Sequence, residues 1–214
     1  MNIFLPTPVA AMQHSVDHFD ALFSNDVDPW KFRSRWYEQR KRALTLACLP
    51  QLRYASGYEP GCANGELSAV LATRCEQLTV SDGSPVAVAM AVNRLADLPH
   101  VTVTQVWVPE QWPMDTFDLI VISEFGFYLD ALSLHGVADR ICASIRPGGT
   151  VLACHWRRPI EGCQFNGDQV HQVLLSRMQE GQTWTSLCQI QEPDMVLDVW
   201  SLDTLSVAQR EGFA

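Results

Sequence analysis

The sequence predicts an α/β protein: one seven-stranded, mostly parallel sheet, an antiparallel strand at its C-terminal end, and an N-terminal helical cap. After residue 50, short apolar runs alternate with helix-like stretches, which is typical of βαβ units. Near the C-terminus two apolar runs are joined only by residues 191–194, and so short a connector forces an antiparallel pair. With 214 residues, of which 47% are hydrophobic, the chain is long enough for one well-packed core.

The cap is expected over residues 1–50, and residues 51–214 form the rest of one compact unit. Asp28-Pro29 offers a capping acid followed by proline, so a helix is expected over residues 28–49, ended by Pro50. Residues 1–27 show no clear pattern.

The elements of the sheet unit follow from the apolar runs and the breakers between them. Gly57 and low apolar content make the first strand weak, and Arg146-Pro147-Gly148-Gly149 is expected to end a helix and turn the chain. Strands are expected at Tyr54–Glu59, Leu78–Asp82, Val101–Gln105, Phe117–Ser123, Thr150–His155, Trp184–Ile190 and Met195–Leu202. Helices are expected at Gly65–Thr73, Pro85–Ala96, Leu132–Ile145 and Gly167–Gln179.

Composition narrows the class of partner. A formal net charge of −9 argues against nucleic acid and against an anionic membrane as partners. Seven cysteines without a C-x-x-C pair indicate reduced thiols and a cytoplasmic protein. A monomer and a homodimer both stay open. His14 and His18 are spaced like metal ligands but lack a third ligand, so no metal is expected.

The segment Glu59-Pro60-Gly61-Cys62-Ala63-Asn64-Gly65-Glu66 follows the first strand. Its glycines permit a tight turn close to a ligand, and Asp82, 21 residues after Gly61, can accept hydrogen bonds from ribose hydroxyls. Ala63 replaces the second glycine of a dinucleotide loop, and Glu66 would repel a pyrophosphate. A nucleoside without phosphates fits better, and S-adenosylmethionine, whose cationic sulfonium tolerates nearby carboxylates, is such a ligand.

Taken with this loop and Asp82, the runs FDLIVISE (117–124) and RPGG (146–149) resemble the successive motifs of class I S-adenosylmethionine-dependent methyltransferases over about residues 28–202. The segments DPW…WYEQRK (28–41) and SEFGFYL (123–129) are similar, more narrowly, to the nodulation protein S type. The resemblance implies a Rossmann-like fold and N-methylation of an amino sugar in an oligosaccharide precursor.

The resemblance implies a cofactor site along the carboxyl edge of the sheet. The family's usual acid after the third strand is missing, so adenine would rest on backbone groups, Gln105 or Trp107. The residues expected to contact the cofactor are Trp30, Tyr37, Glu59, Gly61, Ala63, Gly65, Asp82, Gly83, Ser84, Gln105, Val106, Trp107 and Glu124.

Glu124 and His155 end the fourth and fifth strands, where residues face the reacting centre of an open parallel sheet. Either is a candidate general base, although each also fits a structural role. Tyr128 and Arg157 are candidate substrate contacts, with core packing and solvation as alternatives.

The expected activity is methyl transfer to a small molecule, most narrowly to an amino-sugar nitrogen. Three alternatives stay open at this point: an O-methyltransferase of a small molecule or sugar, a non-catalytic relative that binds the cofactor, and a dinucleotide-dependent oxidoreductase. An excess of tryptophan suggests an aromatic pocket, because five of the seven fall in the cap or in loops near the expected cleft: Trp30, Trp36, Trp107, Trp112 and Trp156. Packing of the cap onto the sheet is the alternative cause.

Overall fold

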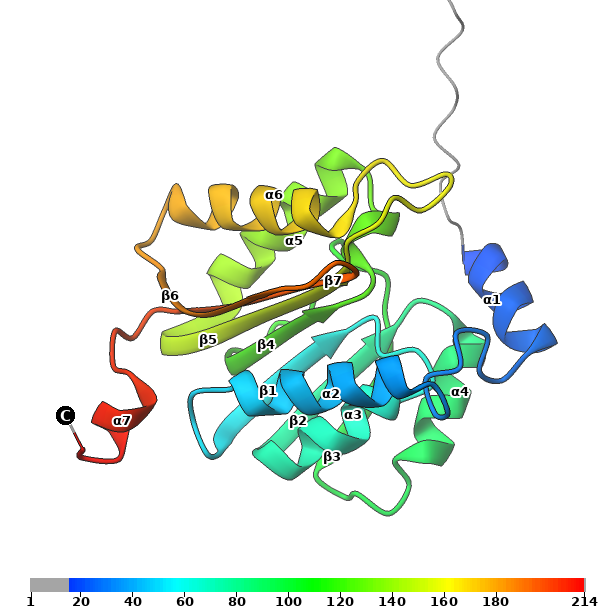
Figure 1. The fold of residues 1–214 in the computed structure, drawn as a ribbon. Coiled ribbons are helices and arrows are strands. Elements are labelled where there is room, and N and C mark those ends of the chain that lie inside the picture. The colour runs from blue at the N-terminus through cyan, green and yellow to red at the C-terminus, as the bar shows by residue number, and fades with distance from the viewer. Residues whose placement is uncertain (1–15, 214) are drawn as a thin grey trace, which may run out of the picture.

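The computed structural model describes the backbone of residues 16–213 and the side chains from residue 18 (Figure 1). Its centre is one seven-stranded sheet in the order β3-β2-β1-β4-β5-β7-β6. The first five strands pair in parallel, whereas β7 runs antiparallel to both β5 and β6, as the short connector requires. The strands are β1 (Tyr54–Pro60), β2 (Cys75–Asp82), β3 (Val101–Gln105), β4 (Phe117–Ser123), β5 (Ile145–Trp156), β6 (Thr185–Gln191) and β7 (Met195–Ser201).

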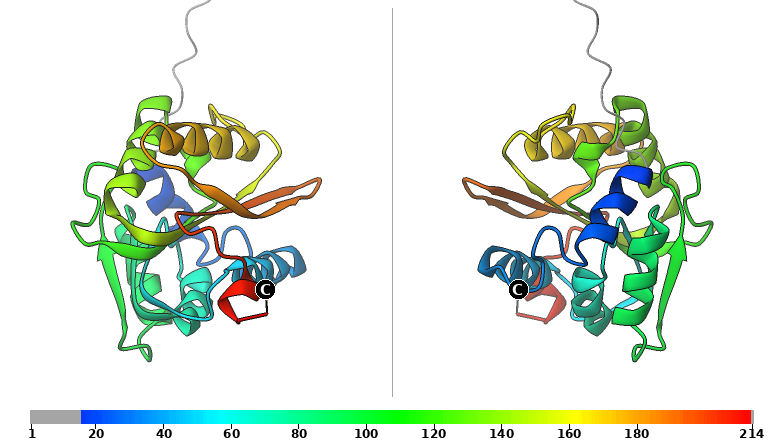
Figure 2. Two further views of the ribbon diagram at one scale, coloured as in Figure 1. Left: turned by 90° about the vertical axis from the view of Figure 1, so that its left-hand side faces the viewer. Right: turned by 90° about the vertical axis from the view of Figure 1, so that its right-hand side faces the viewer.

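Helices cover both faces of the sheet, as Figures 1 and 2 show. Helices α5 and α6 pack on one face, and α2, α3 and α4 on the other, while α1 lies beside α4. The helices are α1 (Val16–Asn25), α2 (Trp36–Cys48), α3 (Glu66–Leu71), α4 (Pro85–Arg94), α5 (Ala131–Ser144), α6 (Gly167–Gln179) and α7 (Val207–Arg210). Two short 3-10 turns, η1 (Ala72–Arg74) and η2 (Gly126–Tyr128), follow α3 and β4.

Strand β4 divides the core into two layers because side chains alternate along a strand. Ile120 and Ile122 belong to the cluster beneath α5 and α6. Leu119 and Val121 belong to the cluster beneath α2 and α3. All four side chains are at most 1% exposed, so the apolar run reflects a strand buried on both faces.

The cap differs from the prediction at its start. Helix α2 begins at Trp36 rather than Asp28, because Lys31 has a φ of 62°, a left-handed conformation that interrupts a helix. The Asp28 carboxylate instead accepts the backbone N–H groups of Phe32 and Arg33 in a local turn. Helix α1 was not predicted from sequence. The division of the chain at residue 50 stays a prediction.

The weak first strand is confirmed as β1. A Cβ atom on Gly57 would lie 2.8 Å from Sγ of Cys75 on β2, so glycine is required by the close approach of the two strands. The segment 146–149 ends α5 as expected, but it does not leave the sheet. Strand β5 already begins at Ile145, and the register shift opposite Phe117 shows that these residues bulge out of the strand.

The strand order reverses between β1 and β4. From β1 the chain moves through β2 to β3 on one side, and then returns to β4 and β5 on the other. In open α/β sheets, ligands bind beyond the carboxyl ends of strands at such a reversal. Among the described residues, no helix combines the length and apolarity needed to cross a membrane.

Candidate active site

The loop after β1 has the backbone conformation that its glycines predict. Gly61, Ala63 and Gly65 have φ values of 71°, 49° and 79°, so the chain turns repeatedly through the left-handed region. A Cβ atom on Gly61 would lie 3.1 Å from the Phe125 ring, which leaves little room for a side chain. The loop therefore brings bare backbone to the carboxyl edge of the sheet.

Asp82, at the end of β2, is held by two backbone donors. Its Oδ2 accepts the N–H of Ala63 at 2.9 Å, and its Oδ1 accepts the N–H of Ser84 at 3.0 Å. Burial raises the pKa of Asp82, these backbone N–H groups oppose that rise, and Asp20 of α1 adds to it. Each carboxylate oxygen keeps a second lone pair for a ligand, and the residue lines the main cavity.

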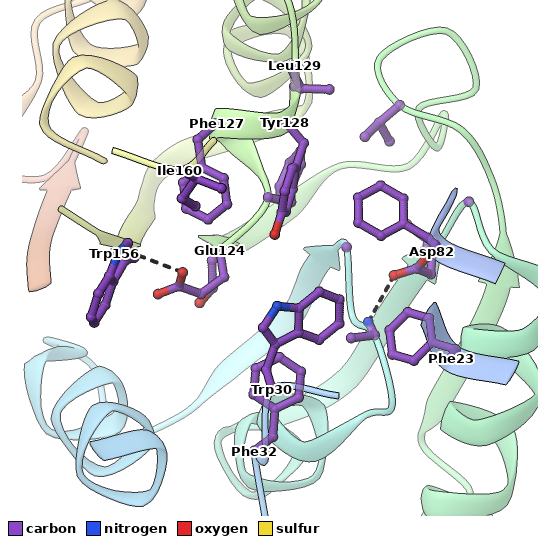
Figure 3. A pocket seen from close by; sticks show the side chains of 18 of the residues that line it. Phe23, Trp30, Phe32, Asp82, Glu124, Phe127, Tyr128, Leu129, Trp156 and Ile160 are labelled. Carbon is purple, nitrogen blue, oxygen red and sulfur yellow. Dashed lines mark hydrogen bonds between the residues drawn. The ribbon is translucent and has the colours of Figure 1, made fainter. Parts of the chain in front are cut away.

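The cavity has a volume of about 410 Å³ and lies over the ends of β1, β2 and β4. Figure 3 shows Asp82 and Glu124 on opposite sides of it, with the hydroxyl of Tyr128 pointing in between them. Its walls are mainly aromatic and come from α1, the following loop, α2, η2 and the ends of the strands. The aromatic lining residues are Phe19, Phe23, Trp30, Phe32, Tyr37, Trp107, Phe125, Phe127, Tyr128 and Trp156.

Beside Asp82 the cavity is lined by Gly83, Val106 and Trp107. A Cβ atom on Gly83 would lie 2.1 Å from Cε3 of Trp107, so the indole packs directly against the glycine backbone. This geometry gives a flat ring an aromatic surface to stack on without an acid after β3.

A charged cluster closes the side of the cavity opposite Asp82. Nζ of Lys41 lies 2.8 Å from Oε1 of Glu124 and 3.0 Å from Oε2 of Glu38. Oε2 of Glu124 also accepts the N–H of Trp156 at 3.3 Å. Burial alone would lower the pKa of Lys41, but Glu124 and Glu38 outweigh it and raise the pKa, so Lys41 is a cation. Two carboxylates and one ammonium leave the cluster with one net negative charge when both acids are ionised.

Glu59 lies at the floor of a side recess beneath the glycine loop, which it shares with Gly61, Ala63 and Lys41. It is 2% exposed, and its Oε2 has no hydrogen-bond partner among the described residues. Burial raises the pKa of Glu59 to about 8, the nearby Ser68 hydroxyl opposes the rise, and Asp82 adds to it. An unpaired buried carboxyl oxygen at a cavity floor is a ready partner for a cationic ligand.

The structure does not bring His155 or Arg157 to the cavity. His155 is fully buried and its ring nitrogens contact Gly126 and His171, so it cannot reach an acceptor as the expected base. Arg157 is bound by Asp168 at 3.0 Å and by the carbonyl of Glu192 at 2.6 Å. Its expected substrate contact is replaced by this ion pair.

Three expected cofactor contacts support the site from outside the cavity. Gly65 precedes α3 and packs near Ala91. Ser84 is fully buried, caps α4 and donates to Asp20. Gln105 is exposed and donates to the carbonyl of Gly83 at 3.3 Å.

Two of the five tryptophans expected near the cleft do not line the cavity. Trp36 is 72% exposed, and Trp112 is buried and donates to the hydroxyl of Ser144.

Several site residues escaped the sequence analysis. Lys41 lies in a stretch rich in basic residues, which is typical of a solvated helix, yet Glu38, Lys41 and Thr45 form one buried face of α2. The spacing of these polar residues, three and four positions apart, was the signal in the sequence that they share one face of the helix. Phe19 and Phe23 lie on the unpredicted helix α1. The other missed lining residues are Phe32, Arg35, Ser81, Val108, Ser123, Phe125, Phe127, Leu129 and Ile160.

His14 lies outside the described residues, and the possible metal pair of His14 and His18 therefore lies outside them as well. Among residues that the structure describes, no group of three or more histidine, cysteine or acidic side chains is arranged to hold a metal ion.

The strand order, the antiparallel end of the sheet, the glycine loop and the strand-end acid together define the class I methyltransferase fold. Within that class, the chain belongs to the nodulation protein S family, because the model of that family matches residues 17–184.

Curated relatives and solved structures agree with this assignment. Nodulation protein S of Rhizobium tropici is 31% identical over 127 residues, which cover 58% of this chain and 53% of the relative. That of Bradyrhizobium diazoefficiens is 30% identical, covering 58% and 61%. The chain thus spans a little over half the length of these relatives.

Two crystal structures are similar in fold. A candidate methyltransferase from Pseudomonas syringae is 50% identical with a TM-score of 0.69, covering 78% of this chain and 99% of the other. The N-methyltransferase NodS of Bradyrhizobium japonicum WM9, in complex with S-adenosyl-L-homocysteine, is 24% identical with a TM-score of 0.77, covering 87% and 97%.

Proposed function

We propose that the protein is an S-adenosylmethionine-dependent methyltransferase that methylates a nitrogen atom of a small molecule. The observation that carries the proposal is Asp82: two backbone N–H groups orient its carboxylate, and the residue lines the cavity at the carboxyl edge of the sheet. Family membership and the printed description of the similar NodS structure support the same activity.

The residues present fit the cofactor along its whole length. Asp82 would accept the ribose hydroxyls, and adenine would pack beside Val106 and the exposed face of the Trp107 indole. Glu59, with its unpaired buried oxygen, would meet the cationic amino-acid end beside the glycine loop. When bound, this cofactor supplies a methyl group on a positively charged sulfur.

The acceptor side lies between Glu124 and the aromatic residues Tyr128 and Trp156. Its walls exclude water and restrict how an amine can approach, and such positioning supplies much of the rate of a bimolecular transfer. Glu124 orients the amine and takes up the proton that nitrogen loses. Lys41 fixes Glu124 through the 2.8 Å ion pair.

An amino sugar is the narrower acceptor that we propose. The family resemblance supports it, and aromatic walls offer sugar rings apolar faces on which to pack. A small soluble acceptor is also consistent with the proposed cytoplasmic location and with a monomer or homodimer.

The test is methyl transfer from labelled S-adenosylmethionine to three acceptor groups: amino sugars, other small amines, and their hydroxyl counterparts. The proposal predicts transfer to amines and none to the hydroxyl counterparts. Transfer to hydroxyls alone would contradict the choice of nitrogen, and preference for a nicotinamide dinucleotide over S-adenosylhomocysteine in a thermal-shift assay would contradict the cofactor.

A further inference from the structure

A buried chain of polar groups connects the C-terminal hairpin with the wall of the cavity. On β7, Oδ2 of Asp198 lies 2.5 Å from Nδ1 of His171 in α6. Nε2 of His171 lies 2.9 Å from Nδ1 of His155 on β5. Nε2 of His155 accepts the backbone N–H of Gly126 at 3.3 Å, and Gln189 of β6 donates to Oδ1 of Asp198 at 2.9 Å.

The three ionisable members of the chain are shut off from the cavity and from solvent. His155 is 0% exposed, and His171 and Asp198 are each 4% exposed. Burial lowers the pKa of His155 well below its ordinary range, and His171 and Lys41 lower it further. His155 is therefore a neutral ring that both accepts and donates.

The hydrogen-bond pattern assigns the position of each proton. Since Gly126 donates to Nε2 of His155, that nitrogen carries no proton, and Nδ1 of the same ring must carry it. Nδ1 of His155 then donates to Nε2 of His171, whose own Nδ1–H donates to Asp198. The three hydrogen bonds between Gly126 and Asp198 therefore all run in one direction, each donor pointing toward the carboxylate.

Gly126 connects this chain to the pocket. It is the first residue of η2, whose other two residues, Phe127 and Tyr128, line the cavity, and Phe125 before it lines the cavity as well. A Cβ atom at Gly126 would lie 2.6 Å from Cγ1 of Val170 and 3.1 Å from Nε2 of His155. The backbone is therefore pressed against α6 and His155, and the N–H bond fixes its orientation.

We propose that Asp198, His171 and His155 form a positioning chain that sets the tautomer of His155, and so holds the Gly126–Tyr128 segment as the acceptor-side wall. The inference rests on the proposed methyl transfer for its effect on turnover. The three residues touch neither cofactor nor acceptor. They act through Gly126, so their loss should affect the acceptor and spare the cofactor, whose ribose and adenine contacts come from β2 and from the residues that follow β3.

The first test needs no variant. Long-range ¹H–¹⁵N spectra of the ligand-free protein distinguish the two neutral tautomers of a histidine. The proposal predicts protonation at Nδ1 in both His155 and His171. Protonation of His155 at Nε2 would remove the acceptor for Gly126 and would overturn the proposal.

The second test uses two amide variants of the same residue. His155→Gln places its terminal amide near the position of Nε2, where its oxygen can accept from Gly126. His155→Asn places its amide near Nδ1, so it keeps the contact with His171 and loses the acceptor for Gly126. Both variants remove the ring, so a role confined to packing would affect them alike.

The expected result is a split between the pair. His155→Asn should speed hydrogen exchange at the Gly126 amide and lower kcat/KM for the acceptor by about 10- to 100-fold, since small misplacements of positioning groups have effects of that size. His155→Gln should stay within about 3-fold of the unmodified protein. Affinity for S-adenosylhomocysteine should change little in either variant.

Asp168→Asn is the control, because it weakens another ion pair of α6 without touching the chain. Equal exchange rates at Gly126 in both His155 variants would overturn the proposal. If the unmodified protein methylates no amine, the proposed function fails, while the exchange rates and tautomers still decide whether the chain holds this segment.

Discussion

The ammonium of Lys41 and the carboxylate of Glu124 lie 2.8 Å apart and join the cap helix α2 to the carboxyl end of β4. The pair is largely buried, since the side chains of Lys41 and Glu124 are 7% and 20% exposed. The carboxylate of Glu38 contacts the same ammonium. The cap is therefore fastened to the sheet at the acceptor side of the cavity.

Replacing this buried cation should be costly. In Lys41→Met, Glu38 and Glu124 would stand close together without a counter-ion, so the free energy of unfolding at pH 7 should fall by about 3 kcal/mol. Urea denaturation measures the change. The matched control is Arg40→Met: Arg40 lies on the same helix as Lys41, and its more exposed ion pair with Glu192, in the turn between β6 and β7, should be worth less than about 1 kcal/mol. Equal losses in the two variants would show that the buried cluster does not fasten the cap.

Glu124→Gln separates chemistry from cofactor binding. The amide keeps an oxygen for Lys41, but it can no longer take up a proton, so turnover should fall by about 100-fold or more. Affinity for S-adenosylhomocysteine should remain within about 2-fold, because the ribose and adenine contacts lie across the cavity. Steady-state kinetics and calorimetry give the two quantities. Glu192→Gln, which alters a surface acid, serves as the control, and normal turnover in Glu124→Gln would place proton removal elsewhere.

Glu59 predicts a pH dependence of stability in the ligand-free protein. Its pKa is about 8 in the folded state, well above the ordinary value of 4.5. A raised folded pKa favours the fold below the unfolded pKa, and this contribution is lost as the pH rises through about 8. The free energy of unfolding should therefore decline between about pH 5 and pH 8 by up to a few kcal/mol.

The variant Glu59→Gln isolates this contribution. Gln cannot ionise, so the decline should be smaller in the variant, and the variant should gain stability relative to the unmodified protein toward pH 8. Denaturation curves at pH 5.5 and 8.5 make the comparison. Parallel pH profiles for the two proteins would contradict the assignment of a neutral, buried Glu59.

The proposed adenine site at Trp107 can be tested by replacing two glycines, one beside the indole and one far from it. Gly83→Ala would place a methyl group 2.1 Å from the present position of Cε3 of Trp107, so the indole must shift away from its place against the glycine backbone. S-adenosylhomocysteine should then bind about 10-fold more weakly, with a change in tryptophan fluorescence. Gly181→Ala is the control, because nothing lies within 4 Å of its added carbon. Unchanged affinity in Gly83→Ala would place adenine elsewhere.

The sequence predicted most of the sheet, and it predicted that the glycine loop and Asp82 lie together at the carboxyl edge of the sheet. Strands buried on both faces, such as β4, appear as continuous apolar runs, and the glycine loop with Asp82 is a local motif whose geometry follows from backbone conformation. The C-terminal hairpin was predicted for a similar reason, since the connector alone fixed the direction of its strands.

The proposed acceptor side of the cavity could not be predicted in the same way, because it is assembled from segments that are distant in the sequence. Lys41 meets Glu124 across 83 residues of sequence, and Phe19 meets Tyr128 with ring centroids 5.1 Å apart. His155 was correctly placed at the carboxyl end of β5. Its orientation toward His171 depends on where α6 packs, which residue spacing does not encode.

Asp82 is proposed to hold the ribose of S-adenosylmethionine, and calorimetry with S-adenosylhomocysteine measures the strength of this contact. The unmodified protein should bind one equivalent, and Asp82→Ala should bind about 100-fold more weakly, because two charge-assisted hydrogen bonds are lost. Asp97→Asn, an exposed acid beyond α4, should bind normally. Equal affinity in Asp82→Ala and the unmodified protein would contradict the account.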